Sequence, residues 1–241
     1  MAQEHIVKAF DEQLNTLDTK IAEMGGMAES ALADAIEALV ERDEEKAEGV
    51  VARDRKLDQV EAEVNALAMR MLALRQPMAI DLRTVLSALK ISGDLERIGD
   101  LAKNIAKRVM AVSKTQPAQF NHTIAQMGAL VQDMIKGALD AYVARDSKLA
   151  QDVWNRDEEV DQLHTSLFRE LLTYMMEDPR NITPCAHLLF VAKNLERIGD
   201  HVTNIAERVV FLVEGKMPDE RQTEDASSFT VVGPDGRSKS G

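Results

Sequence analysis

The chain carries columns of oxygen-bearing side chains inside a string, LERIGD, that occurs twice in its 241 residues. Each copy contributes a glutamate, an aspartate four residues later and an asparagine four residues after that: Glu96, Asp100 and Asn104, then Glu196, Asp200 and Asn204. Residues spaced by four lie close to one face of a helix. Carboxylate and amide oxygens arranged in this way are ligands that hard metal ions prefer.

A second set of polar residues precedes each string by about 40 residues. Its members are Asp54, Asp58 and Glu61 in the first half, and Asp157, Asp161 and His164 in the second half. If the two helices of each half pack side by side, the sets form two sites with four or more carboxylates each. We therefore predict that all twelve residues are metal ligands, for magnesium, manganese, iron or zinc, with His164 making the second site softer.

A solvated acidic helix face is the simpler interpretation of these columns. Two observations argue against it. Like charges four residues apart destabilise a helix by about 0.2–0.5 kcal/mol, and the mid-helix Gly99 and Gly199 each cost about 1 kcal/mol relative to alanine. A cation would neutralise the repulsion, and a glycine permits close backbone approach. For Arg97 and Arg197 the simplest role is an ion pair on the same helix, with Asp100 or Asp94 in the first half.

The duplication extends well beyond LERIGD. A shift of 103 positions pairs Arg42-Asp43 with Arg145-Asp146, and Arg53-Asp54 with Arg156-Asp157, whereas the two strings themselves are related by a shift of 100. One half therefore lacks three residues, near Pro77 or Pro179, where a surface turn tolerates a change of length. The chain therefore consists of two copies of one unit of roughly 100 residues, a common domain size.

Long proline-free segments rich in Ala, Leu, Glu, Lys, Arg and Met predict an all-α fold. We expect three helices per unit, over residues 5–41, 44–75, 78–114, 119–144, 147–177 and 181–214. Asp43 and Asp146 are expected to cap helices, Pro77 to lie in the first turn of the third helix, and Gly215 to end the last helix. Short connections favour antiparallel packing. The expected domains are two tandem three-helix bundles, 5–115 and 119–215, followed by a disordered polar tail, 216–241.

The acidic composition limits the classes of partner. A formal net charge of −12 and a pI near 4.9 argue against non-specific binding to nucleic acid or anionic lipid and favour cations. No segment has the roughly 20 apolar residues of a membrane span, and the N-terminus does not resemble a signal peptide. Cys185 is the only cysteine, which excludes an intramolecular disulfide. We expect a soluble cytoplasmic protein.

From about Phe10 to Gly215 the chain resembles the PhoU family of bacterial phosphate-signalling regulators. The duplicated E-x-x-x-D pairs, Glu96/Asp100 and Glu196/Asp200, match the family signature, and the upstream D-x-x-x-D pairs match its second ligand-bearing helix. The resemblance implies two bundles related by a pseudo-twofold axis, metal ions or clusters on the acidic surfaces, and a cytoplasmic homodimer. It also implies coupling of the ATPase subunit of the phosphate ABC transporter to a sensor histidine kinase, which represses the phosphate-starvation response when phosphate is plentiful.

Three functions remain open from the residues alone. A non-enzymatic adaptor agrees with the lack of a nucleophile–base constellation and of a GxxxxGK[ST] phosphate loop. A metal-carboxylate enzyme with redox or hydrolytic chemistry is the alternative, although di-iron bundles use a pair of Glu-x-x-His sequences and this chain offers only Asp161-x-x-His164. A helical scaffold without metal is the third. We favour the adaptor.

Overall fold

The computed structural model of the chain describes residues 2–75, 77–112 and 120–218, and helices make up nearly all of these ranges, with no strand among them. The long helices are α1 (Ala2–Glu41), α2 (Glu44–Arg75), α3 (Ile80–Val112), α4 (Asn121–Ala144), α5 (Ser147–Asn155), α6 (Asp157–Glu177) and α7 (Ile182–Glu214). A short 3-10 helix, η2 (Pro179–Asn181), precedes α7. The predicted all-α fold is confirmed.

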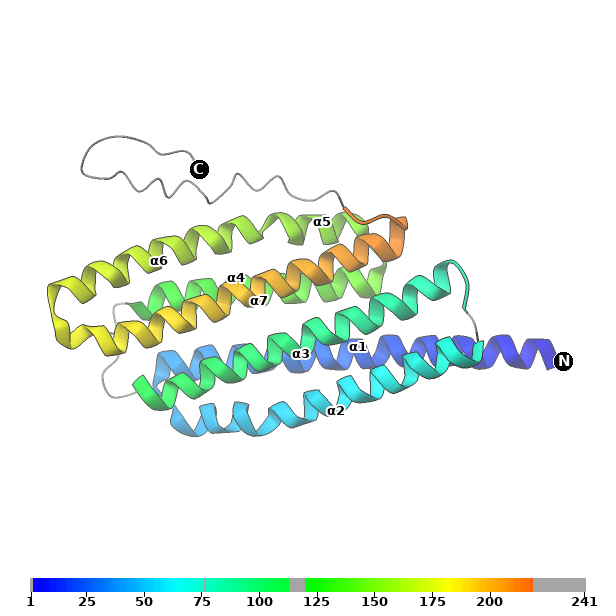
Figure 1. Cartoon of the computed structure of the whole chain (residues 1–241), viewed down its shortest axis with the longest axis horizontal. Coiled ribbons are helices and arrows are strands. Elements are labelled where there is room, and N and C mark those ends of the chain that lie inside the picture. Colours follow the sequence, from blue (N-terminus) through cyan, green and yellow to red (C-terminus); the bar gives the residue numbers. More distant parts are fainter. Residues whose placement is uncertain (1, 76, 113–119, 219–241) are drawn as a thin grey trace, which may run out of the picture.

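The two repeats pack along their length, with α1–α3 in one and α4–α7 in the other (Figure 1). Within the first repeat α3 packs against α1 and α2, and within the second α7 packs against α4, α5 and α6. Between the repeats, α3 packs against α7 and α1 against α4. The third helix of each repeat therefore contacts both its own bundle and the other one, and α3 and α7 run antiparallel.

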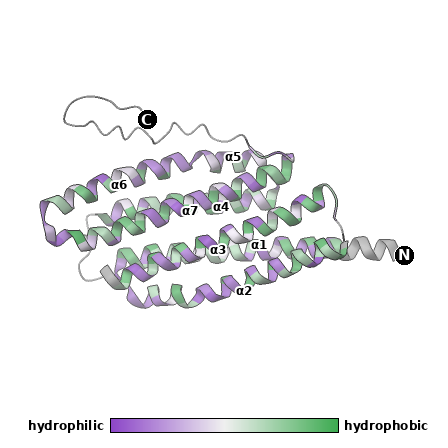
Figure 2. Cartoon of the chain, viewed as in Figure 1, coloured by the Kyte–Doolittle hydropathy of each residue, from purple (hydrophilic) through white to green (hydrophobic). Residues whose placement is uncertain are grey.

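The repeated string separates core residues from surface residues. Leu95 and Ile98 of α3 and Leu195 and Ile198 of α7 are fully buried, whereas Glu96 and Glu196 keep part of their surface in solvent. Figure 2 shows the same alternation of hydrophobic and hydrophilic residues along every long helix. Burial of such apolar stripes is the main force that holds amphipathic helices together. The stripe also fixes which face of α3 and α7 presents the carboxylates.

The Arg-Asp pairs matched by the repeat form the same turn twice. Arg42 and Arg145 adopt left-handed φ values of 61° and 54°, which ends the preceding helix. The next residue then caps the following helix: Asp43 Oδ1 accepts from the backbone N–H of Lys46 at 2.9 Å, and Asp146 Oδ1 from that of Lys148 at 2.9 Å. Both capping predictions are confirmed.

Two boundary predictions are wrong. The segment 147–177 is two helices, because α5 ends at Asn155 and α6 begins at Asp157. Asparagine is a weak helix former, and the acidic run that starts at Asp157 suits a helix N-terminus. Pro77 does not lie in the first turn of α3, which begins at Ile80, because Ala79 has a φ of 51° that a right-handed helix cannot contain.

The end of α7 is the one predicted: Gly215 closes it with a φ of 75°. The predicted disordered tail lies outside the described residues from position 219 onward, as does the expected end of the third helix beyond Val112. None of the described helices combines the length and the apolar character needed to cross a membrane.

Candidate metal centres

The first acidic cluster lies between α2 and α3 and contains a lysine that the sequence analysis did not assign. Lys103 Nζ is 2.5 Å from Asp54 Oδ2 and 2.5 Å from Asp100 Oδ1. The Lys103 side chain is 20% exposed and that of Asp54 only 8%. The ammonium group therefore occupies the place between the two helices where a metal ion was predicted. A lysine three residues after an aspartate on the same helix was the signal that could have identified it.

This lysine changes the titration of its neighbours. Partial burial alone would lower the pKa of Lys103, but hydrogen bonds to Asp100 and Asp54 outweigh burial and raise it above its usual value. Partial burial opposes ionisation of Asp100 as well, yet the bond from Lys103 lowers its pKa overall. Glu96 lacks such a partner, so burial and then repulsion from Asp100 raise its pKa.

The remaining predicted ligands of the first half are only partly brought together. Glu61 lies near enough to Glu96 to repel its charge, and it accepts a hydrogen bond from Asn65 Nδ2 at 3.1 Å. Asp58 and Asn104 are exposed. In the described part of the chain neither forms a hydrogen bond or ion pair with the cluster. The structure thus joins Asp54, Glu61, Glu96 and Asp100 and leaves the other two aside.

Arg97 forms the ion pair expected of it. Its Nη1 is 3.5 Å from Asp100 Oδ2, and its Nε is 3.5 Å from Glu96 Oε2. Because the arginine side chain is 61% exposed, the pair is strongly screened and adds little stability.

The second acidic cluster, between α6 and α7, has no lysine in the corresponding place. Thr203 stands at the position equivalent to Lys103, and its hydroxyl donates to the Asp200 backbone carbonyl at 2.7 Å. Partial burial, followed by repulsion from Glu196 and Asp157, raises the pKa of Asp200 to about 6. Lys193 Nζ lies 2.5 Å from Glu196 Oε2, and its charge partly offsets the rise in the pKa of Asp200.

Asn204 and His164 are not drawn into this cluster. Asn204 Nδ2 donates to Asp94 Oδ1 at 3.4 Å, across the interface between the repeats. His201 Nδ1 lies 2.9 Å from the same oxygen, so it faces away from the cluster. The His164 ring contacts Phe168, one turn along α6, with centroids 6.5 Å apart. Asp157, Asp161, Glu196 and Asp200 form the second cluster.

Gly99 and Gly199 permit the close approach that was predicted for them. A Cβ added to Gly99 would lie 2.2 Å from Leu57 Cδ2, and one added to Gly199 would lie 3.2 Å from Asp157 Oδ1. The α2 and α6 side chains therefore rest directly on the backbone of α3 and α7. This contact brings the carboxylates of the paired helices together in both repeats.

Within residues 2–75, 77–112 and 120–218 no three His, Cys, Asp or Glu side chains converge as a metal site. Metal ligation by the twelve residues therefore stays a prediction. The two clusters differ in how well their chemistry fits a cation. Burial, and then repulsion between the carboxylates, raises the pKa of Asp200 in the second cluster, whereas Lys103 already neutralises part of the first.

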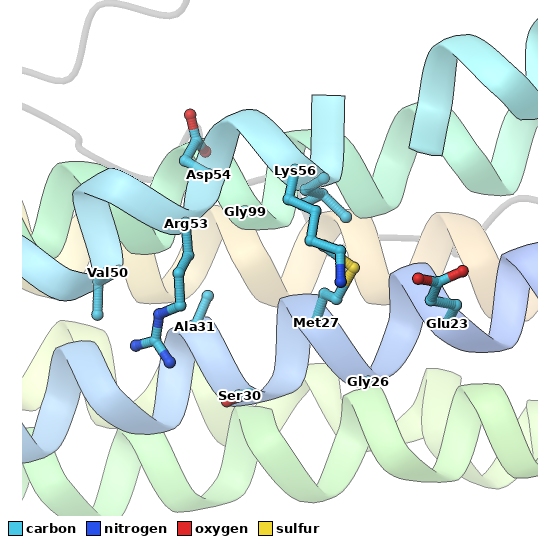
Figure 3. A pocket seen from close by; sticks show the side chains of 11 residues that line it. Glu23, Gly26, Met27, Ser30, Ala31, Val50, Arg53, Asp54, Lys56 and Gly99 are labelled. Atoms are coloured by element: carbon cyan, nitrogen blue, oxygen red, sulfur yellow. The ribbon is translucent and has the colours of Figure 1, made fainter. Parts of the chain in front are cut away.

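A surface groove of about 340 Å³ lies beside the first cluster, between α1 and α2 (Figure 3). Small residues of α1, Gly26, Ser30 and Ala31, form one wall. Arg53 points towards α1 and pairs with Asp34 at 2.5 Å, whereas the carboxylate of Asp54 points the other way. The groove therefore adjoins the acidic cluster and shares Asp54 with it, although the carboxylate of Asp54 points away from α1.

Comparison with known proteins matches both repeats to one family model, the PhoU domain, at residues 21–109 and 124–209. The phosphate-specific transport system accessory protein PhoU homolog of Caulobacter vibrioides (strain NA1000 / CB15N) is 53% identical over 88% of this chain and 93% of the relative. The homolog of the same name from Rhizobium meliloti is 49% identical over 96% of this chain and 98% of the relative.

Solved structures share the fold. The crystal structure of PhoU from Pseudomonas aeruginosa superimposes with a TM-score of 0.84 at 38% identity, covering 86% of this chain and all of that one. The phosphate transport system regulatory protein PhoU from Streptococcus pneumoniae gives a TM-score of 0.82 at 31% identity, over 88% of this chain and all of that one.

Proposed function

The chain belongs to the PhoU family, and we propose that it is a non-enzymatic accessory regulator of the phosphate-specific transport system. The observation that carries this function is the match of both repeats to the PhoU domain, together with relatives named as accessory proteins of that system that align over most of their length. The two-bundle structure supports the role, because long exposed helices offer extended surfaces to partner proteins.

The proposed role has two protein partners. The chain binds the ATPase subunit of the phosphate ABC transporter and the sensor histidine kinase of the phosphate regulon, and represses the starvation response when phosphate is plentiful. It acts in the cytoplasm as a homodimer. The resemblance to PhoU regulators supports these assignments, and the acidic net charge of −12 favours basic partner surfaces over nucleic acid or anionic lipid.

Metal ions belong to the proposal as structural ligands. We assign the stronger site to Asp157, Asp161, Glu196 and Asp200, since an ion there would relieve the repulsion that raises the pKa of Asp200. The ion would supply positive charge that joins α6 to α7, as Lys103 joins α2 to α3. Elemental analysis of protein purified without chelator, beside the Asp100→Ala/Asp200→Ala variant, tests for bound magnesium, manganese, iron or zinc.

Deletion of the gene tests the regulatory role. Phosphate-starvation genes should stay on in phosphate-rich medium and be repressed again when the wild-type chain is restored. Affinity capture from phosphate-replete cells should recover the transporter ATPase and the kinase. Normal repression after deletion would refute the proposal, and sustained phosphatase or oxidase turnover, abolished by Glu96→Ala and Glu196→Ala, would favour the enzyme instead.

A further inference from the structure

Three buried polar atoms without hydrogen-bond partners in the described residues come from two facing helices that are far apart in the sequence. They are Arg83 Nε and Ser87 Oγ of α3, and Arg208 Nε of α7. The Ser87 residue is only 1% exposed. Buried donors without acceptors cost roughly 1–3 kcal/mol each, so such a group calls for an acceptor that the described residues do not supply.

The register of α3 and α7 places these residues together. The pairs Asp94–His201 and Arg108–His187 fix how the two antiparallel helices face each other. The same register sets Ser87 opposite Arg208. Arg83 is one turn before Ser87 on α3, and its Nη1 lies 1.9 Å from where a Cβ of Gly215 would be. All three side chains therefore meet at the C-terminal end of α7.

Both guanidinium groups at this end lack a carboxylate partner among the described residues. Arg208 Nη1 donates to the thioether of Met217 at 3.4 Å, and a thioether is a weak acceptor. The acidic residues of α7 nearest to Arg208, Glu207 and Glu214, line a groove on the α5 side instead, where Trp154 Nε1 donates to Glu207 Oε1. The helix dipole offers only about half a negative charge at a C-terminus. Among the described residues, two full positive charges are thus largely uncompensated.

At the other end of the α3–α7 interface, the equivalent arginine has partners within the chain. The pseudo-twofold relation maps Arg208 onto Arg108, and Ser87 onto His187. Arg108 Nη1 lies 3.5 Å from His187 Nδ1, and its guanidinium stacks 4.7 Å from the centroid of the Phe190 ring. Arg208 has no aromatic ring and no imidazole in the equivalent places, which Lys90 and Ser87 occupy. The difference points to an acceptor from outside the described residues.

We propose that Arg83, Ser87 and Arg208 form a binding site for a small tetrahedral oxyanion, represented by inorganic phosphate. Planar guanidinium groups match phosphate oxygens with paired N–H donors, and the Ser87 hydroxyl supplies one more donor. The anion replaces the Met217 sulfur as the acceptor for Arg208. This site is separate from the acidic clusters and does not depend on the proposed regulatory role.

Calorimetric titration of inorganic phosphate into the full chain, with EDTA present to keep metal out of the acidic clusters, tests the proposal. One saturable site is expected. Arg83→Gln and Arg208→Gln should each weaken binding about tenfold or more, since a charge-assisted hydrogen bond is lost, and Ser87→Ala should weaken it less. Arg208→Lys keeps the positive charge but loses the paired N–H donors of the guanidinium group. Its affinity for phosphate should therefore fall between those of Arg208→Gln and the wild type.

The matched control is Arg108→Gln, at the equivalent position of the other repeat, which should leave phosphate affinity unchanged. Phosphate should also raise the melting temperature of the wild type, and not of Arg83→Gln/Arg208→Gln, at equal ionic strength. No saturable binding, or an equal loss in Arg108→Gln, would overturn the proposal.

Two further titrations define the ligand. Binding of sulfate with similar affinity supports a site for tetrahedral oxyanions, whereas chloride should not compete at equal ionic strength. Asp219 and Glu220 follow this end of α7 in the sequence. Phosphate binding that emerges only in Asp219→Asn/Glu220→Gln would show that the chain's own carboxylates fill the site, and would overturn phosphate as its ligand.

Discussion

The two acidic clusters arise from one duplicated helix pair, yet they balance their charge differently. In the first repeat Lys103 bridges Asp54 and Asp100, and the pKa of Asp100 is lowered. In the second repeat the position of Lys103 is held by Thr203, and the pKa of Asp200 is raised to about 6. One cluster thus contains a lysine bonded to two of its aspartates, whereas the other has a threonine at the equivalent position.

This difference shows how a duplicated ligand set can diverge without losing its backbone geometry. Both glycines, both aspartates on the second helix and both E-x-x-x-D pairs persist. A single lysine-to-threonine difference changes the local charge and hence the need for an external ion. The proposed metal ion would thus do in the second repeat what the ammonium group of Lys103 does in the first, which is to join the two helices that carry the carboxylates.

Exchanging these two residues should have the largest effect. Thr203→Lys should weaken manganese binding at the second cluster at least about a hundredfold, because two unit charges about 4 Å apart repel by roughly 4 kcal/mol at an effective dielectric constant near 20. Lys103→Thr should raise the manganese affinity of the first cluster by a comparable factor. Isothermal titration with manganese measures both changes.

The double variant Lys103→Thr/Thr203→Lys gives a sharper test, because it should move the manganese site from the second cluster to the first. Its manganese binding should be lost on adding Asp100→Asn and kept on adding Asp200→Asn, the reverse of the wild type. Lys107→Thr, an exposed lysine on α3, serves as the control and should leave manganese affinity unchanged. Equal affinities of the two clusters in the wild type would refute the comparison.

The next largest difference is expected in the free energy of unfolding when Gly99 and its equivalent Gly199 are each replaced by alanine. Gly99→Ala must displace the buried Leu57, whose Cδ2 would lie 2.2 Å from the new Cβ. Overpacking costs about 1–3 kcal/mol, against about 1 kcal/mol gained in helix propensity. Gly199→Ala requires a smaller shift of Asp157, at 3.2 Å, so its free energy of unfolding should stay within about 1 kcal/mol of the wild type. Urea denaturation measures both, and an equal loss would contradict the packing argument.

Much of the fold can be predicted from the sequence, because the repeat and the spacing of apolar residues indicate where helices form and which face of each is buried. The turns at Arg42-Asp43 and Arg145-Asp146 were predictable, since capping depends on neighbouring residues. The break at Arg156 was not, because the matching segment of α2 around Arg53 remains one helix. Pro77 was misplaced because the left-handed Ala79 that delays α3 has no sequence signature.

The sequence predicts which residues share a face of one helix, and the candidate sites could be predicted only to that extent. Four of the six predicted residues in each half meet because the two helices that carry them pack side by side as expected. Asn204 does not join them, since its partner Asp94 belongs to the other repeat. Lys103 was missed for a related reason. Whether its long side chain turns to Asp54 or to solvent depends on the distance between α2 and α3, which Gly99 sets.

Equivalent aspartates should respond to neutralisation in opposite directions. Asp100 has a folded pKa below its unfolded value, so its charge contributes stability above about pH 4 that is lost as pH falls through the folded pKa. Asp200 has a folded pKa of about 6, above the unfolded value of 3.8, so stability falls as pH rises from the lower value to the higher.

In metal-free protein at pH 7.5, Asp100→Asn should lose about 0.5–1 kcal/mol of unfolding free energy, because the screened pair with Lys103 is broken. Asp200→Asn should gain up to about 1 kcal/mol, solvent screening included, and should flatten the pH dependence below pH 6. Urea titrations at several pH values measure both effects. A change of the same sign in the two variants would show that Lys103 does not distinguish the clusters.

A further comparison concerns the α1–α4 contact, where the repeats again differ. Tyr142 Oη donates to Asp18 Oδ1 at 2.6 Å, whereas the equivalent position in the first repeat is the apolar Leu39. Burial and the Asp18 carboxylate raise the pKa of Tyr142, so the phenol stays a donor throughout the physiological range. Tyr142→Phe should therefore lose about 1 kcal/mol of unfolding free energy in urea. Tyr174→Phe, at the only other tyrosine, should change it by less than about 0.5 kcal/mol. Equal values for the two variants would mean that this bond does not help to join the repeats, and that their apolar contacts suffice.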